Sequence, residues 1–154
     1  MTMKNLLVAI TLLLTAATSY AGQELQFVDA YIPAAPPGAK TMAAYLTINN
    51  TGNKDTKIVS VSCDEFESTE IHRSIVENDV AKMEHVPELT IPAKTQVILS
   101  PGGLHLMLIN PLEEILPGEL VSLKFKESDG TEHSLTVKVK FVYHSDSQHD
   151  HHQQ

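Results

Sequence analysis

The chain has 154 residues, carries 19 acidic side chains against 11 basic ones for a formal net charge of −8, and contains no tryptophan. Such an acidic chain is a poor partner for nucleic acids and for anionic membrane surfaces, which argues against both classes as partners. Cys63 is the only cysteine, which excludes an internal disulfide, and we expect it to be a small buried apolar residue.

The N-terminal segment predicts a signal peptide rather than part of the fold. Lys4 supplies a positive charge, and the apolar run over residues 6–17 is too short for a comfortable membrane span. Small residues at Ser19 and Ala21 suit a signal peptidase, so we expect residues 1–21 to be removed, which lowers the formal charge of −8 by one unit. The residue directly after Ala21 is Gly22 rather than a cysteine, so we expect no lipid anchor there. No second apolar run of spanning length exists, so we expect no membrane insertion after cleavage and predict a soluble, exported, periplasmic protein.

Short runs rich in β-branched and aromatic residues fill the rest of the chain. Turn signals such as "PAAPPGAK", "NNTGNKD", "PGG" and "ESDG" separate them. This pattern predicts one all-β domain over residues 22–143, an antiparallel sandwich or barrel, followed by a disordered tail over residues 144–154. The predicted strands cover residues 24–32, 43–50, 56–63, 67–76, 80–86, 95–100, 103–110, 120–126 and 132–143.

The hairpin predicted over residues 69–86 carries the first candidate metal ligands. Asn78 and Asp79 suit a turn, and a loop of two residues places His72 and Met83 on one face, which His85 shares. A three-residue loop reverses that relation, so the prediction depends on register. Taken singly, a methionine is usually core filler and a strand histidine is usually a surface or hydrogen-bonded residue.

The segment "GGLHLMLIN", residues 102–110, carries the second pair of candidates. Its leucines alternate with His105 and Met107, so successive side chains point to opposite faces of the strand. We expect the leucines to face the core, which places the imidazole and the thioether together on the other face. That face normally meets water in a sandwich, where a methionine gains little. A mixed pair of this kind indicates a soft-metal site, because thioether sulfur is a good ligand for Cu(I) and imidazole tolerates it.

The spacing of these four residues, with ten, twenty-one and one residues between successive members, resembles the signature of the periplasmic PCu(A)C-type copper chaperones. The flanking segments "AAYLTINN", "VPELTIPAKTQVILSPGGLHLMLIN" and "LPGELVSLKFKESDG" are also similar to that family, over roughly residues 24–143. One departure is Arg73, at a position where the family often has methionine.

The resemblance implies a cupredoxin-like β-sandwich that binds one Cu(I) through His72, Met83, His105 and Met107. It also implies delivery of copper to the CuA centre in subunit II of cytochrome c oxidase, directly or with a Sco-type thiol protein, by a monomeric, non-enzymatic carrier. Neutral imidazole and thioether ligands bind Cu(I) more weakly than thiolates do, so transfer toward cysteine-containing sites is downhill. We expect stepwise ligand exchange in which the methionines detach first.

The tail raises a second metal hypothesis. Its imidazoles and carboxylates suit Cu(II) or Zn(II) better than Cu(I), and a short His-rich tract is typical of metal binding. The alternative is a solvated tail without specific function, because a flexible segment loses entropy when it orders around an ion. The candidate ligands are His144, His149, His151 and His152, beside Asp146 and Asp150.

The sequence raises four alternatives to a copper chaperone. A blue-copper electron-transfer centre needs a cysteine thiolate, and Cys63 is predicted on a different strand from His105 and Met107. No "GxSxG" or "HExxH" motif is present, so we expect no hydrolase. A metal-free sandwich used for adhesion or interaction explains the fold but leaves the four-residue spacing as coincidence. A general periplasmic copper buffer needs the same site as a chaperone.

Overall fold

The computed structural model describes residues 24–142 and contains ten β-strands and no helix over that range. None of these residues therefore belongs to a helix long and apolar enough to cross a membrane. The strands are β1 (Leu25–Pro33), β2 (Thr41–Asn50), β3 (Thr56–Cys63), β4 (Phe66–Glu77), β5 (Val80–His85), β6 (Leu89–Ile91), β7 (Gln96–Leu99), β8 (Leu104–Pro111), β9 (Leu120–Glu127) and β10 (Glu132–Lys140).

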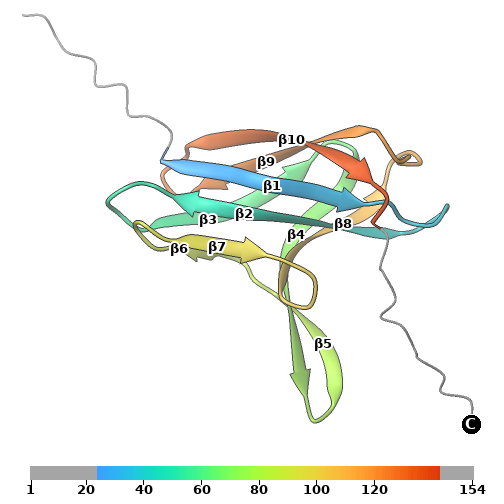
Figure 1. Cartoon of the computed structure of the whole chain (residues 1–154), viewed down its shortest axis with the longest axis horizontal. Coiled ribbons are helices and arrows are strands. Elements are labelled where there is room, and N and C mark those ends of the chain that lie inside the picture. The colour runs from blue at the N-terminus through green and yellow to red at the C-terminus, as the bar shows by residue number, and fades with distance from the viewer. Residues whose placement is uncertain (1–23, 143–154) are drawn as a thin grey trace, which may run out of the picture.

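The strands form one folded-over sheet in the order β5-β4-β8-β2-β1-β10-β9-β3-β6, and β7 pairs separately with β2 (Figure 1). The pairing is antiparallel except between β1 and β10, which run parallel at Ile32↔Val139. β2 bridges two parts of the sheet, since its first half pairs with β8 and its second half with β7. The predicted all-β, cupredoxin-like sandwich is confirmed.

Alternating apolar residues on the inner faces of the strands form the core. On β2 every second residue from Met42 to Ile48 is buried, and on β8 Leu106 and Leu108 are fully buried. This period-two pattern is what closes the two layers of a sandwich around one core. Other fully buried side chains come from the remaining strands: Ile32, Ile58, Ile91, Leu99, Val121, Leu123, Phe125 and Val137.

The structure differs from the expected strands in two places. β6, only three residues long, was not predicted, and it pairs with β3 through Ile58↔Leu89. The final strand ends at Lys140, three residues before the predicted end, and Phe141 is largely exposed. The predicted signal peptide (1–21) and the His-rich tail (144–154) lie outside the described residues, so the domain limits remain predictions.

The β4–β5 hairpin projects from the body of the sandwich (Figure 1). Its turn is the two-residue Asn78-Asp79 loop, because Glu77 pairs directly with Val80. Both turn residues have positive φ, 52° and 61°, as the hairpin turn compatible with strand twist requires. The two-residue loop that the sequence required for a shared ligand face is therefore present.

Candidate metal centre

Three histidines form a row across the sheet, with β4 at its centre. His72 pairs directly with His85 on β5 and with His105 on β8. Directly paired residues share a face, so all three imidazoles lie on the same side of the sheet. The ring centroids of His72 and His105 are 6.1 Å apart, and those of His72 and His85 are 5.7 Å apart.

The two candidate methionines lie on that same face, on opposite sides of the row of histidines. Met83 is opposite Ser74, two residues from His72, and Met107 is opposite Glu70, two residues on the other side. Met83 is therefore a diagonal neighbour of His72, as the hairpin prediction required. Strand register alone brings the four predicted ligands to one face of β4, β5 and β8.

His72 has one ring nitrogen bonded and one without a partner. Its Nε2–H donates to a Glu70 carboxylate oxygen at 2.8 Å, which leaves Nδ1 with the lone pair. Nδ1 is buried and has no hydrogen-bond partner, while the side chain as a whole is 14% exposed. A buried polar atom normally finds a partner, so an unpaired imidazole lone pair here fits a nitrogen that receives a metal.

His105 is fixed in a comparable way. Its Nδ1–H donates to the Gly103 carbonyl oxygen at 3.1 Å, which assigns the free lone pair to Nε2. The same carbonyl accepts the Ser74 N–H at 3.1 Å and ties the loop before β8 to β4. Only 6% of His105 is exposed, so this part of the outer face is covered rather than open to water as the sequence suggested.

The two thioethers differ in their surroundings. Met83 is 63% exposed on the projecting hairpin, whereas Met107 is partly buried on β8, between β4 and β2. The interpretation of Met83 as core filler is wrong, because most of its side chain is exposed to solvent and lies outside the core.

Between His72 and the turn, the ligand face of the hairpin carries no acidic or basic side chain. By register, Ser74, Val76 and Ala81 share the face of His72 and Met83. The charged hairpin residues Arg73, Glu77, Lys82 and Glu84 lie on the opposite face. Arg73, the departure from the family pattern, therefore points away from the candidate site.

Within residues 24–142, no three His, Cys, Asp or Glu side chains are grouped closely enough to hold an ion by themselves. A metal on this face therefore needs the two thioethers, or a small rotation of the imidazoles, to complete its ligand set. Two neutral nitrogens and two thioether sulfurs suit Cu(I) and give hard ions such as Mg²⁺ or Ca²⁺ nothing to bind.

Cys63 is not part of this centre. Its thiol is buried on β3 and donates to the Glu65 carboxylate at 3.0 Å. Burial, together with that hydrogen bond, raises the pKa of Cys63 to about 12, so the thiolate that a blue-copper centre needs does not form near neutral pH. The prediction that Cys63 is a small buried residue is confirmed.

Sequence reasoning missed the residues that orient the imidazoles. Glu70 was not singled out, although its place two residues before His72 on the same strand face was a usable signal. The Gly103 carbonyl left no signal in the sequence, because backbone acceptors are revealed only by the fold. The tail residues His144, His149, His151 and His152 lie outside the described residues.

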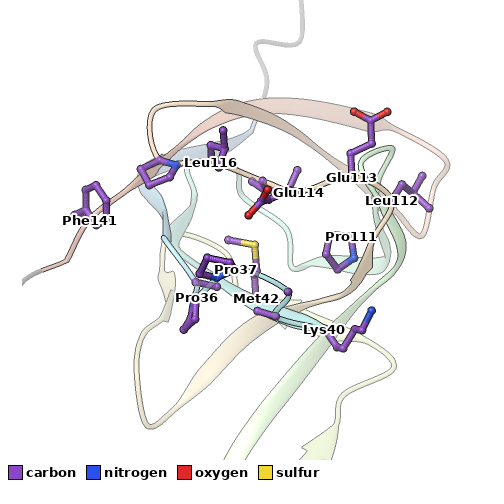
Figure 2. A pocket seen from close by; sticks show the side chains of 15 residues that line it. Pro36, Pro37, Lys40, Met42, Pro111, Leu112, Glu113, Glu114, Leu116 and Phe141 are labelled. Atoms are coloured by element: carbon purple, nitrogen blue, oxygen red, sulfur yellow. The ribbon is translucent and has the colours of Figure 1, made fainter.

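A hollow of about 560 Å³ lies where β2 begins and β8 ends. Met42 projects into it between Pro37 and Pro111, and Glu114 lies at its rim (Figure 2). Pro111 is six residues from His105, which along a strand corresponds to about 20 Å. Met42 pairs with Leu108 on the core face of the sheet, whereas Met107 lies on the outer face, so Met42 and the hollow it enters contribute nothing to the imidazole and thioether cluster.

The chain belongs to a family of lipoprotein-like domains. The family model described as "Putative lipoprotein LpqE-like" matches residues 25–139. "Uncharacterized protein RP573" of Rickettsia prowazekii is 34% identical over 98 residues, which span 63% of this chain and 54% of that protein. "Putative lipoprotein Lxx21020" of Leifsonia xyli subsp. xyli is 28% identical over 117 residues, which span 75% of this chain and 69% of that protein. The chain thus matches only about half of the Rickettsia protein, and the lipoprotein names suggest an exported protein.

Solved structures with the same fold are PCuAC domains. The solution structure of Cu(I)-DR1885 from Deinococcus radiodurans is 29% identical, with a TM-score of 0.63 over 80% of this chain and 83% of that one. The copper-bound PCuAC domain of PmoF2 has a TM-score of 0.66 at 16% identity, over 80% of this chain and 97% of that one. The apo PCuAC domain of PmoF1 has a TM-score of 0.64 at 20% identity, over 77% of this chain and 95% of that one. The fold is that of a PCuAC domain.

Proposed function

We propose that this protein is a periplasmic metallochaperone that carries one Cu(I) through His72, Met83, His105 and Met107. The observation that carries the proposal is the direct pairing of His72 with His105, each with one ring nitrogen bonded to the protein and the other left free. The thioethers Met83 and Met107 flank this pair on the same face. The ion is the protein's cargo rather than a catalytic cofactor.

The donor chemistry supports Cu(I) over other ions. Two imidazoles and two thioethers add no negative charge of their own, so the bound ion contributes a single positive charge to a partly buried face. Glu70 holds His72 in one tautomer, and orienting carboxylates of this kind strengthen metal binding by histidine. The likeness to a Cu(I)-bound domain at 29% identity supports the same conclusion.

We further propose that the copper passes to a thiolate-rich acceptor. The acceptors that the family resemblance implies are the CuA centre in subunit II of cytochrome c oxidase and a Sco-type thiol protein. Met83 is 63% exposed at the projecting hairpin, so an incoming thiolate reaches the ion from that side while the buried His105 still holds it. The part of the hairpin's ligand face between His72 and the turn carries no acidic or basic side chain, so it gives the acceptor a surface that costs little free energy to desolvate.

The test is a Cu(I) titration in competition with a coloured chelator, on the mature chain and on a Met83→Leu/Met107→Leu variant. We expect one tight equivalent for the unchanged protein and at least about a tenfold loss of affinity for the variant. Met42→Leu is the matched control, because Met42 is a buried core methionine and its replacement leaves both sulfurs of the site in place. Equal affinity in all three proteins would favour a metal-free interaction module.

Binding alone does not separate a chaperone from a general copper buffer. Cu(I)-loaded protein mixed with a purified, copper-free CuA domain distinguishes them. A chaperone speeds copper incorporation beyond the rate at which the chelator delivers Cu(I) at the same free concentration, whereas a buffer gives equal rates.

A further inference from the structure

We propose that β5 is a self-association edge, along which a second copy of this chain adds its own β5 in antiparallel register. The inference goes beyond the proposed function and does not rest on it, because no metal takes part in the pairing. The partner is a second copy rather than an unrelated strand, since the charges of β5 complement themselves in one register and repel each other in the neighbouring ones.

β5 lies at the open edge of the sheet. It begins the strand order β5-β4-β8, and over residues 24–142 its only pairing is with β4. All of its residues are exposed, and the hairpin to which it belongs projects from the sandwich, so nothing else in the described part of the chain covers this edge (Figure 1). An uncovered edge strand of this kind is a template for pairing with another strand.

Every second residue of β5 directs its backbone groups toward that edge. In an antiparallel ladder, residue pairs that exchange hydrogen bonds alternate with pairs that do not. The Val86 N–H donates to the Ile71 carbonyl oxygen at 2.8 Å, which fixes this alternation along the hairpin. Ala81, Met83 and His85 therefore point their N–H and C=O groups away from β4. A second strand placed at this edge meets regularly spaced donors and acceptors.

The charges of β5 select one register for two copies. A two-fold axis at Met83 places Met83 opposite Met83, Ala81 opposite His85, and Lys82 of each copy opposite Glu84 of the other. Moving the axis by one residue puts Lys82 opposite Lys82, or Glu84 opposite Glu84, and like charges directly opposite each other are destabilising. Lys82 and Glu84 share the face away from His72, so the joined sheet keeps both ligand faces on one side.

The size of the contact predicts a weak, reversible dimer. The six residues of β5 span about 20 Å, and the outward-facing residues of two copies form about six backbone hydrogen bonds. Lys82 already pairs with Glu77 of its own copy at 2.5 Å, and 53% of its side chain is exposed, so its ammonium group has room for a second carboxylate. Exposed charge pairs are screened by salt, so the dimer should weaken as ionic strength rises.

The experiment follows the mass of the full mature chain by sedimentation velocity, at protein concentrations up to about 1 mM and with a chelator present to remove metal. The same measurement is made on Lys82→Glu, on Glu84→Lys, on an equimolar mixture of these two variants, and on the double variant Lys82→Glu/Glu84→Lys. Lys126→Glu is the matched control, because it makes the same change of charge at an exposed residue of β9, which lies between β10 and β3.

We expect a monomer–dimer equilibrium for the unchanged chain and for Lys126→Glu, and at least about a tenfold weaker dimer for each single variant at the edge. Mixing Lys82→Glu with Glu84→Lys should restore association, because each charge of one variant then faces its opposite on the other, and the double variant should dimerise as the unchanged chain does. A chain that stays monomeric at every concentration overturns the inference. So does a dimer that ignores the single substitutions, or a loss that mixing does not restore.

Discussion

His72 on β4 and His105 on β8 face each other directly across an antiparallel pair, with ring centroids 6.1 Å apart. The two residues are far apart in the chain, so their contact depends on the register between β4 and β8. A slip of one residue would send one imidazole into the leucine-lined core and leave the other outside. The ladder that positions Ile71 against Leu106 in the core therefore also positions the two histidines outside it.

Replacing Glu70 should weaken copper binding without touching a ligand. Glu70→Ala removes the acceptor that fixes the His72 tautomer, and we expect Cu(I) affinity to fall about tenfold, within the range for outer-shell partners of metal-bound histidine. Glu70→Gln keeps an amide oxygen that accepts the same hydrogen bond and should cost less. The control is Glu67→Gln, on the same strand, whose carboxylate accepts from Asn110 instead. Equal Cu(I) affinity for Glu70→Ala and the unchanged chain would show that Glu70 does not contribute to copper binding.

Oxidation of the methionines should report both exposure and metal protection. Hydrogen peroxide converts exposed methionine to its sulfoxide, so in the metal-free protein Met83 should react first, then Met107, and the buried Met42 last. Silver(I) serves as a soft ion that peroxide does not oxidise, and in chloride-free buffer it should protect Met83 and Met107 together. Mass spectrometry of peptides gives the order. Silver that protects neither sulfur would contradict their role as ligands.

Cys63 should behave as a buried, inert thiol. Its pKa is raised to about 12, so a thiol reagent at pH 8 should modify it only after denaturation. Cys63→Ala should leave Cu(I) affinity unchanged, because the residue lies on β3, away from the ligand face. Rapid labelling of the native protein, or a loss of Cu(I) binding in the variant, would refute this assignment.

The same pKa predicts a pH dependence of stability. The unfolded chain releases the Cys63 proton near the ordinary value of 9.0, while the folded chain keeps it until about 12. The native state binds more protons in that window, so the contribution of Cys63 to the free energy of unfolding falls as pH rises from about 9 toward 12 and is constant below about 9. Denaturant titrations at several pH values should show a shallower alkaline loss for Cys63→Ala.

Substitutions in the hairpin turn should change stability and leave copper binding intact. Asp79 has a φ of 61°, which glycine adopts without strain, so Asp79→Gly should stabilise the protein by about 0.5–1 kcal/mol. Asp79→Val should destabilise it by about 1–2 kcal/mol, because a β-branched side chain is strained there. Denaturant unfolding measures both changes. Asp79→Gly should keep the full Cu(I) affinity, since the register that places Met83 is unchanged, and a lost affinity would show that the turn sets more than stability.

Local patterns predicted the parts of the site that lie within one strand or one hairpin. The alternation around His105 and Met107 gave their shared face, and the turn residues Asn78 and Asp79 gave the face of Met83. The pairing of β4 with β8 was beyond such reasoning, because register between distant strands is set by packing across the whole core. The family resemblance supplied the joint ligand set, and local periodicity alone left it open.

The errors have physical causes as well. The strand Leu89–Ile91 was missed because the four residues between Pro87 and Pro92 look like a loop, and only pairing with β3 makes three of them a strand. The outer face at His105 was expected to meet water, yet this residue is only 6% exposed, because β8 is a central strand flanked by β4 and β2. Burial of that kind depends on neighbours that one strand's pattern does not reveal.

X-ray absorption spectroscopy at the copper edge tests the central claim most directly. For the Cu(I)-loaded mature chain the account predicts two imidazole nitrogens and two thioether sulfurs around one copper, and only the nitrogens after Met83→Leu/Met107→Leu. Copper bound by nitrogen alone in the unchanged protein, or by a thiolate from Cys63, would contradict it.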